Sequence, residues 1–237
     1  MQQISQGYWI VIPAAGFGSR FGQEKPKQYW SLHGKTILEH TLNLFVEQPW
    51  VKQIIVAVAE SDPYFKQLSL THHKIKWVVG GETRSQSVMN ALTYLPLSAQ
   101  NDWVLVHDAA RACLDERDLY ALLELRDDTV GGILASPAAD TLKKVDGKNQ
   151  IVQTINRNEI WLAQTPQMFR VHLLKKALEK AKASDYTITD EASAIEYLGY
   201  TPCVVEAQFP NPKLTYAADL KYVEFLLSGK LMEDVLL

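Results

Sequence analysis

The sequence of 237 residues predicts an α/β fold whose central sheet is mostly parallel. Continuous apolar runs at 8–12, 53–59 and 103–106 are typical of strands that are buried on both faces. Helix-start patterns lie between these runs, so successive strands are expected to be joined by right-handed βαβ crossovers. A hairpin signal at 141–155 interrupts this alternation later in the chain.

The composition is that of an ordinary globular protein, with 47% apolar and 22% charged residues. The net charge of -3, without a block of like charges, argues against a general nucleic-acid or anionic-membrane binder. No apolar run approaches the roughly 20 residues of a membrane-spanning helix, and the first residues do not resemble a signal peptide. We therefore expect a cytoplasmic protein. Cys113 and Cys203 are far apart and do not have metal-site spacing.

The first strand, 8–12, runs into a group of small residues and then into cations. Pro13 ends the strand because it has no N–H to donate. Arg20 supplies a planar fork and Lys27 a compact charge, the two usual ways of holding phosphate oxygens. Backbone N–H groups can approach a ligand closely where side chains are small. The small residues are Ala14, Ala15, Gly16 and Gly18.

The glycine spacing alone is not diagnostic. Gly16, Gly18 and Gly22 miss the dinucleotide fingerprint by one residue, and no Gly-Lys-Ser/Thr follows to make a P-loop. On the glycines alone, the alternative is a strand that ends in a glycine turn, with Arg20 and Lys27 in solvent.

The next elements continue the βα alternation. Thr36 and Glu39 form a capping-box pattern that predicts a helix to about Glu47, and a strand follows at 53–59. A third strand, 77–81, ends in Gly80 and Gly81, which precede a second capping-box pattern at Thr83 and Gln86. This junction offers free N–H groups at a helix N-terminus, although a plain strand-to-helix turn has the same pattern. Arg84 either assists binding there or faces solvent.

A fourth strand, beginning at Trp103, delivers His107, Asp108 and Arg111 at its carboxyl end, where open α/β sheets bind ligands. Asp108 could hold Mg²⁺ or a hydroxyl, or it could simply cap the next loop. We interpret His107 as structural. A helix from Asp115 to about Leu125 and a strand at 131–137 follow.

The later part of the chain departs from the alternation. Thr141 to Ile155 predicts two short strands about an Asp146-Gly147 turn, and such a hairpin is marginal in water unless it packs on another surface. The stretch 161–169 leads into a helix at 171–183. Remaining elements are expected as a helix start at Thr189, where this hydroxyl is the cap, a strand at 202–207 and a helix over 216–227. Lys213 lies in a loop, where a lone lysine is usually solvated.

Four motifs occur in order: P-A-A-G-x-G-x-R with K-P-K, G-G-x-x-R-x-x-S-V, H-D-A-A-R, and T-D-E-A-S before N-x-K-x-T. Over nearly the whole chain this series resembles the 2-C-methyl-D-erythritol 4-phosphate cytidylyltransferase family. The resemblance implies a Rossmann-like, mostly parallel sheet flanked by helices, in one domain of residues 1–237. It also implies a protruding hairpin arm at about 139–157. Ala112 and Pro212 depart from the family pattern, which has a proline and an aliphatic residue there.

The resemblance implies transfer of a cytidylyl group from CTP to a polyol phosphate in non-mevalonate isoprenoid biosynthesis. Mg²⁺ is the implied cofactor, with Asp108 the candidate protein ligand, and a homodimer formed through the arm is implied. The implied catalytic residues are Arg20, Lys27, Arg157 and Lys213. The implied nucleotide-binding residues are Ala14, Ala15, Gly16, Gly18, Gly80, Gly81, Glu82 and Ser87. The implied acceptor-binding residues are Asp108, Arg111, Thr141, Thr165 and Thr189.

Two alternatives remain at this level. A ribitol-5-phosphate cytidylyltransferase would share the fold and most motifs, but its first loop typically reads A-G-G-x-G-x-R, where this chain has A-A-G. A nucleotide-binding regulator without catalysis would need affinity but would not need both Arg20 and Lys27.

Overall fold

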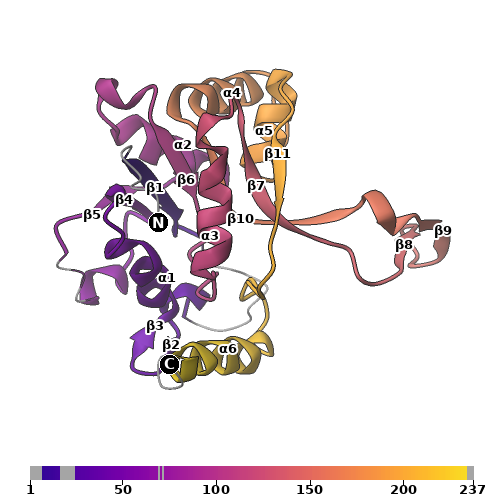
Figure 1. Cartoon of the computed structure of the whole chain (residues 1–237), viewed down its shortest axis with the longest axis horizontal. Helices are drawn as coiled ribbons and strands as arrows, with labels where there is room; N and C mark the ends of the chain where they lie inside the picture. The colour runs from indigo at the N-terminus through magenta and orange to yellow at the C-terminus, as the bar shows by residue number, and fades with distance from the viewer. Residues whose placement is uncertain (1–6, 17–24, 69, 71, 234–237) are drawn as a thin grey trace.

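The computed structural model describes residues 7–16, 25–68, 70 and 72–233. Its centre is a seven-stranded sheet in the order β11-β7-β10-β6-β1-β4-β5 (Figure 1). The strands are β1 (Tyr8–Pro13), β4 (Val51–Val58), β5 (Ile75–Val79), β6 (Trp103–Val106), β7 (Gly131–Pro137), β10 (Trp161–Arg170) and β11 (Cys203–Glu206).

Helices cover both faces of this sheet. They are α1 (Ile37–Val46), α2 (Arg84–Tyr94), α3 (Glu116–Leu123), α4 (Val171–Ala183) and α5 (Glu191–Leu198). A further helix, α6 (Asp219–Glu233), belongs to neither layer. One apolar core packs α1 and α3 against the sheet, and a second packs α2, α4 and α5 against the other face. The helix pattern of the sequence explains this sorting, because each helix has one apolar side.

The mostly parallel sheet is confirmed. Ile10 of β1 lies between Ile54 of β4 and Leu105 of β6, and both of these pairings are parallel. β5 and β11 also pair in parallel with their neighbours. The carboxyl ends of β1 and β6 therefore meet at one edge of the sheet, which positions the loops that follow them.

The sequence did not predict β10, which is antiparallel to both β6 and β7. Its residues Trp161–Arg170 lack regular alternation, and the pairing register shifts between Ala163 and Gln167. Pro166 lies in this irregular part, where a residue without an N–H is tolerated. The other differences are at boundaries: the last helix begins at Asp219 rather than Tyr216 and extends to Glu233.

The predicted helix starts are largely correct. Thr36 and Glu39 form the complete capping box that begins α1. At α2 only half of the predicted box forms: the Thr83 side chain accepts from the N–H of Gln86, but the Gln86 side chain packs over Gly81 instead of returning to the cap.

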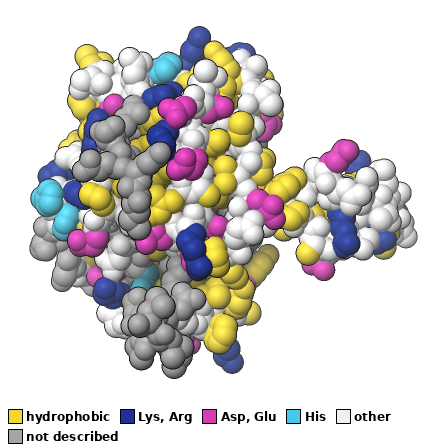
Figure 2. Space-filling view, in the orientation of Figure 1, with side chains coloured by type: hydrophobic (Ala, Val, Ile, Leu, Met, Phe, Trp, Pro, Cys, Tyr) yellow, Lys and Arg dark blue, Asp and Glu magenta, His cyan; other side chains and the backbone are white. Residues whose placement is uncertain are grey.

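Residues 141–155 contain an antiparallel pair, β8 (Leu142–Val145) and β9 (Ile151–Ile155). The turn is longer than a two-residue hairpin, and the Asp146 carboxylate accepts from the N–H groups of Lys148 and Gln150. This arm extends away from the main body, and Figure 2 shows it as a lobe on a narrow neck. Several of its apolar side chains are exposed, namely Val145, Ile151 and Val152, as are Trp161 and Leu162 at its base.

A third apolar cluster holds α6 against the segments that follow β6 and precede α6. Val223 and Leu227 of α6 pack with Leu214, Ala112 and Cys113. This cluster therefore supports the loop that contains Lys213. Within the described ranges, none of the helices combines the length and the apolar character needed to span a membrane.

Candidate active site

A pocket of about 170 Å³ lies at the carboxyl ends of β1 and β6. Five chain segments line it, and they contain more than half of the residues expected to act on ligands. The lining residues are Pro13, Ala14, Ala15, Gly16, Lys27, Gln28, Gly81, Glu82, Thr83, Arg84, Ser87, Asp108, Ala109, Ala110 and Lys213.

The turn after β1 is held by a side chain that sequence reasoning missed. The Gln28 amide is buried and donates to the carbonyl oxygens of Ala14 at 2.8 Å and Gly16 at 3.2 Å. With these carbonyls engaged, the shape of the turn is fixed. Lys27 precedes Gln28, lines the pocket and donates to the carbonyl oxygen of Leu214 at 2.6 Å. A neutral amide after K-P-K carries no pattern that would single it out. Gly18 and Arg20 lie outside the described residues.

The junction between β5 and α2 packs directly on this turn. A Cβ atom on Gly80 would lie 2.5 Å from the Cβ atom of Ala15 and 2.9 Å from the Ser87 hydroxyl, so only glycine fits. The buried Ser87 hydroxyl accepts from the N–H of Gly81 at 3.0 Å and bonds the carbonyl oxygen of Thr83 at 3.0 Å. Ser87 thereby fixes the backbone around Glu82, which lines the pocket.

Asp108 is the electrostatic centre of the pocket. Its carboxylate, nearly buried, bonds Arg84 Nε at 2.9 Å and Lys213 Nζ at 2.7 Å, and Arg111 Nε lies 3.8 Å away. Burial alone would raise the Asp108 pKa, but Arg84, Lys213 and Arg111 together lower it well below its ordinary value. Asp108 is therefore an ionised group at any physiological pH. Lys213 is not solvated in isolation, because it pairs with Asp108.

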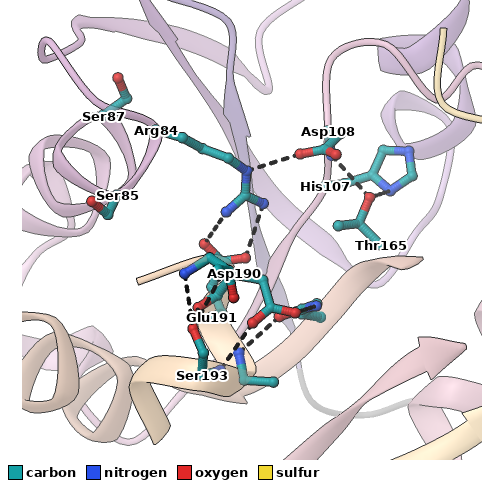
Figure 3. Close-up of polar contacts among 12 residues, drawn as sticks. Arg84, Ser85, Ser87, His107, Asp108, Thr165, Asp190, Glu191 and Ser193 are labelled. Atoms are coloured by element: carbon teal, nitrogen blue, oxygen red, sulfur yellow. Dashed lines mark hydrogen bonds and ion pairs between the residues drawn. The ribbon is translucent and has the colours of Figure 1, made fainter. Parts of the chain in front are cut away.

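Arg84 is only partly exposed, with 28% of its side chain accessible, and it has two acidic partners. Its two terminal nitrogens bond both oxygens of Glu191 at 2.6 and 2.9 Å, while its Nε bonds Asp108 (Figure 3). Glu191 begins α5 and is fully buried. Arg84 and Glu191 are 107 residues apart, so no local pattern could have predicted the pair.

Two buried side chains support Asp108 from behind. His107 Nε2 lies 2.9 Å from the carbonyl oxygen of Arg111, which requires an N–H there, so Nδ1 accepts the hydroxyl proton of Thr165. The Thr165 oxygen in turn accepts from the N–H of Asp108 at 3.0 Å. Burial lowers the pKa of His107 to about 4, which keeps the ring neutral. The structural interpretation of His107 is confirmed, and Thr165 is buried behind Asp108.

The segment after β11 closes the pocket from the other side. Arg111 donates to the carbonyl oxygen of Asn211, and the N–H of Leu214 bonds the carbonyl oxygen of Ala110 at 2.9 Å. Asn211 is buried and its amide donates to the carbonyl oxygen of Thr165. These bonds place Lys213 beside Asp108 despite the proline at 212.

Four of the five expected acceptor-binding residues do not line this pocket, and neither does Arg157 of the expected catalytic set. Arg111 and Thr165 lie behind Asp108, and the other two are Thr141 and Thr189. Thr141 and Arg157 are exposed at the root of the arm, where Arg157 donates to the carbonyl oxygen of Ala139. Thr189 is also exposed, and it is not the helix cap. Asp190 caps α5 instead, in a reciprocal capping box with Ser193. Aspartate is as good a cap as threonine, so T-D-E-A-S did not fix the cap position.

Among the described residues, no group of three or more His, Cys, Asp and Glu side chains is arranged to hold a metal ion. Asp108 and Glu82 are the carboxylates of the pocket lining, and both Asp108 oxygens are engaged by Arg84 and Lys213. This donor set suits a cation held mainly by ligand oxygens and water, as Mg²⁺ commonly is.

Comparisons with known proteins agree with this architecture. The model of the 2-C-methyl-D-erythritol 4-phosphate cytidylyltransferase family matches residues 8–229. The enzyme of that name from Mannheimia succiniciproducens is 50% identical over 97% of this chain and 100% of its own, and that from Pseudomonas fluorescens is 48% identical over 94% and 97%. The crystal structure of the Francisella tularensis enzyme has a TM-score of 0.83 at 41% identity, over 93% of this chain and 100% of that one.

Proposed function

The chain belongs to the 2-C-methyl-D-erythritol 4-phosphate cytidylyltransferase family, and from this premise we propose how its residues divide the reaction. The enzyme transfers a cytidylyl group from CTP to 2-C-methyl-D-erythritol 4-phosphate, giving 4-diphosphocytidyl-2-C-methyl-D-erythritol and pyrophosphate. A phosphate oxygen of the acceptor forms a bond to the α-phosphorus while the bond to the pyrophosphate oxygen breaks. This is a step of isoprenoid biosynthesis, and we place it in the cytoplasm, where CTP is available.

The nucleotide occupies the two packed turns of the pocket. The turn at Ala14 to Gly16, continued by Gly18, receives the triphosphate, because small residues allow N–H groups to reach phosphate oxygens. The Gly80 to Ser87 junction reads cytosine with its backbone and Glu82. Ser87 shapes this backbone through its two main-chain bonds.

Catalysis consists of alignment and charge stabilisation, because two anions must meet and negative charge grows on the departing pyrophosphate. Lys27, whose ammonium is anchored on the Leu214 carbonyl, supplies one charge at the pocket. Arg20 supplies the other.

The acceptor binds over Asp108 and Lys213. Its hydroxyls bond the Asp108 carboxylate, and Lys213, which is 2.7 Å from that carboxylate, then turns to the acceptor phosphate. Arg111 and Thr165 keep Asp108 in place from its buried side, and Thr189 lies next to the α5 cap. The phosphate needs a further cation, which we assign to Arg157.

Asp108 is the pocket residue that would help to hold a Mg²⁺ ion arriving with CTP. When bound, this ion neutralises charge on the phosphates that the lysines do not reach.

Arg157 and Thr141 reach an active site through dimerisation. Both are exposed on the arm rather than in the pocket of their own chain, and the arm carries exposed apolar side chains at Val145, Ile151 and Val152. A two-stranded hairpin of this size gains its stability from another surface. A second copy, related by a two-fold axis, would cover the arms and bring Arg157 to the neighbouring pocket.

The observation that carries the proposal is the meeting of the Ala14–Gly16 turn, Lys27 and the Asp108–Lys213 pair at one sheet edge. The test is pyrophosphate release from CTP with 2-C-methyl-D-erythritol 4-phosphate and ribitol 5-phosphate side by side, and with UTP in place of CTP. Only CTP with the methylerythritol acceptor should turn over at the full rate, because a base-reading site left with mismatched hydrogen bonds rejects UTP. Equal rates with both acceptors, or with both nucleotides, would contradict the assignment.

A further inference from the structure

The Arg84 side chain extends from the start of α2, beside the proposed nucleotide site, to Asp108 at the proposed acceptor site (Figure 3). Its backbone begins α2, one residue after the cap Thr83, and so belongs to the nucleotide junction. Its side chain extends to Asp108 at the end of β6 and to Glu191 at the start of α5. One side chain therefore joins three elements that meet at the site.

The geometry of this contact uses the whole guanidinium group. Nε bonds Asp108 at 2.9 Å, and the two terminal nitrogens bond the two oxygens of Glu191 at 2.6 and 2.9 Å. The fork is planar and rigid, so the position of Glu191 fixes the direction in which Nε points. A lysine could not make both contacts.

The charges make this arrangement firm. Burial by itself would lower the Arg84 pKa, but the carboxylates of Glu191 and Asp108 raise it above the ordinary value. Arg84 is thus a permanent cation with two anionic partners. Glu191 is not among the residues that line the pocket, whereas Arg84 is. Glu191 would therefore influence a bound ligand through the position of Arg84.

We propose that Arg84 and Glu191 are positioning residues that couple the nucleotide site to the acceptor site. The inference rests on the proposed roles of the Gly80–Ser87 junction and of Asp108. A nucleotide that orders the start of α2 also orders Arg84, which orients Asp108 for the hydroxyls of the acceptor. By reciprocity, bound acceptor raises nucleotide affinity by the same factor.

An ion pair that only stabilised the packing of α2 on α5 would need the contact between Arg84 and Glu191. It would not need the contact between Arg84 and Asp108. Lys52 and Asp102 illustrate the difference: their bond of 2.8 Å lies at the amino end of β6, away from the pocket. Asp102 also accepts from the Trp9 ring N–H. Asp102 is therefore a matched control for Glu191, because it is an acid that accepts from two donor groups but lies away from the pocket.

The test measures binding of 2-C-methyl-D-erythritol 4-phosphate by calorimetry, with and without the unreactive α,β-methylene analogue of CTP. In the unmodified enzyme the analogue should raise acceptor affinity. Glu191→Gln keeps the size of the side chain but removes the charge that holds Arg84, and it should reduce this enhancement about tenfold, a typical allosteric coupling factor. It should also raise the acceptor KM more than the CTP KM. Arg84→Lys should behave in the same way.

Asp102→Asn should lower the melting temperature and leave the enhancement unchanged. If Glu191→Gln does not fold, Arg84→Lys provides the same measurement. The proposal is overturned if the folded variants keep the full enhancement, or if the unmodified enzyme shows none. Failure of the reaction itself is a separate outcome, because the unmodified enzyme would then release no pyrophosphate from the same two substrates.

Discussion

The pocket and the arm differ in how their charged side chains are surrounded. In the pocket, Asp108 is nearly buried and has three cationic neighbours, one of which is held in turn by Glu191. On the arm, Arg157 is exposed, and its side chain donates to the carbonyl oxygen of Ala139 at the root of the same arm. The fold alone brings the charges of the pocket together. In the proposed function, the charge on the arm needs a second copy of the chain to reach a pocket.

The largest expected effect falls on the pocket. Lys27→Ala should lower kcat by about 10²-fold to 10³-fold, because it removes a charge that the transition state needs most. Steady-state kinetics at saturating CTP and acceptor measure it. Stability should change less than kcat, since the bond to the Leu214 carbonyl is only partly buried. Near-normal turnover of the variant would show that Lys27 is not a catalytic residue.

The next largest effect on activity is expected at the arm. It tests whether the arm acts in the pocket of another subunit, whereas the pocket is built within one chain. If the proposed dimer forms, Arg157→Ala should lower activity almost as strongly, because the acceptor phosphate would lose the cation assigned to it. Mixing Arg157→Ala chains with Lys27→Ala chains should restore activity, since one pocket of each mixed dimer then has both native charges. If subunit exchange is confirmed and activity stays at the level of the parents, each arm serves its own chain and the two regions are not divided between subunits.

A smaller effect tests the close packing of the nucleotide turns. Gly80→Ala should raise the CTP KM about tenfold, because its methyl group would push the Ala15 turn away. The acceptor KM should change less. Gly229→Ala is the matched control: an added methyl group meets no atom within 4 Å there, so the kinetics should not change. Equal CTP KM values for both variants would show that the turn tolerates displacement.

The last expected effect concerns pH, and it acts on stability rather than on activity. The His107 pKa is about 4 in the folded protein and 6.5 unperturbed, so the unfolded chain binds more protons between these values and stability falls as pH decreases through this range. The loss is about 3 kcal/mol between pH 7 and pH 4. Urea unfolding at both pH values measures it. His107→Gln should flatten the dependence, and an unchanged pH slope in that variant would assign it to other groups.

The sequence was sufficient for the parallel core, because short continuous apolar runs such as the one at Ile54 to Val58 favour buried strands when helix-start patterns separate them. Local motifs also singled out residues that the structure brings into one pocket, including Asp108 and Lys27. It failed for β10, whose proline and mixed polarity resemble a loop until β6 and β7 are in place on both sides. It failed for Gln28 and Glu191 because their roles come from partners brought together by the fold, and no spacing encodes a contact across 107 residues.

The bond between the N–H of Leu214 and the carbonyl of Ala110 has a consequence for the order in which the protein is made. The strands that carry Ala14, Gly80 and Asp108 leave the ribosome early, and the nucleotide turns can form around them. Lys213, the carbonyl that anchors Lys27, and the helix that packs behind Leu214 all come later in the chain than these turns. A nascent or truncated chain that ends before this segment holds the Ala14–Gly16 turn without the anchor of Lys27. The pocket is therefore complete only after this segment has left the ribosome and bonded to Ala110.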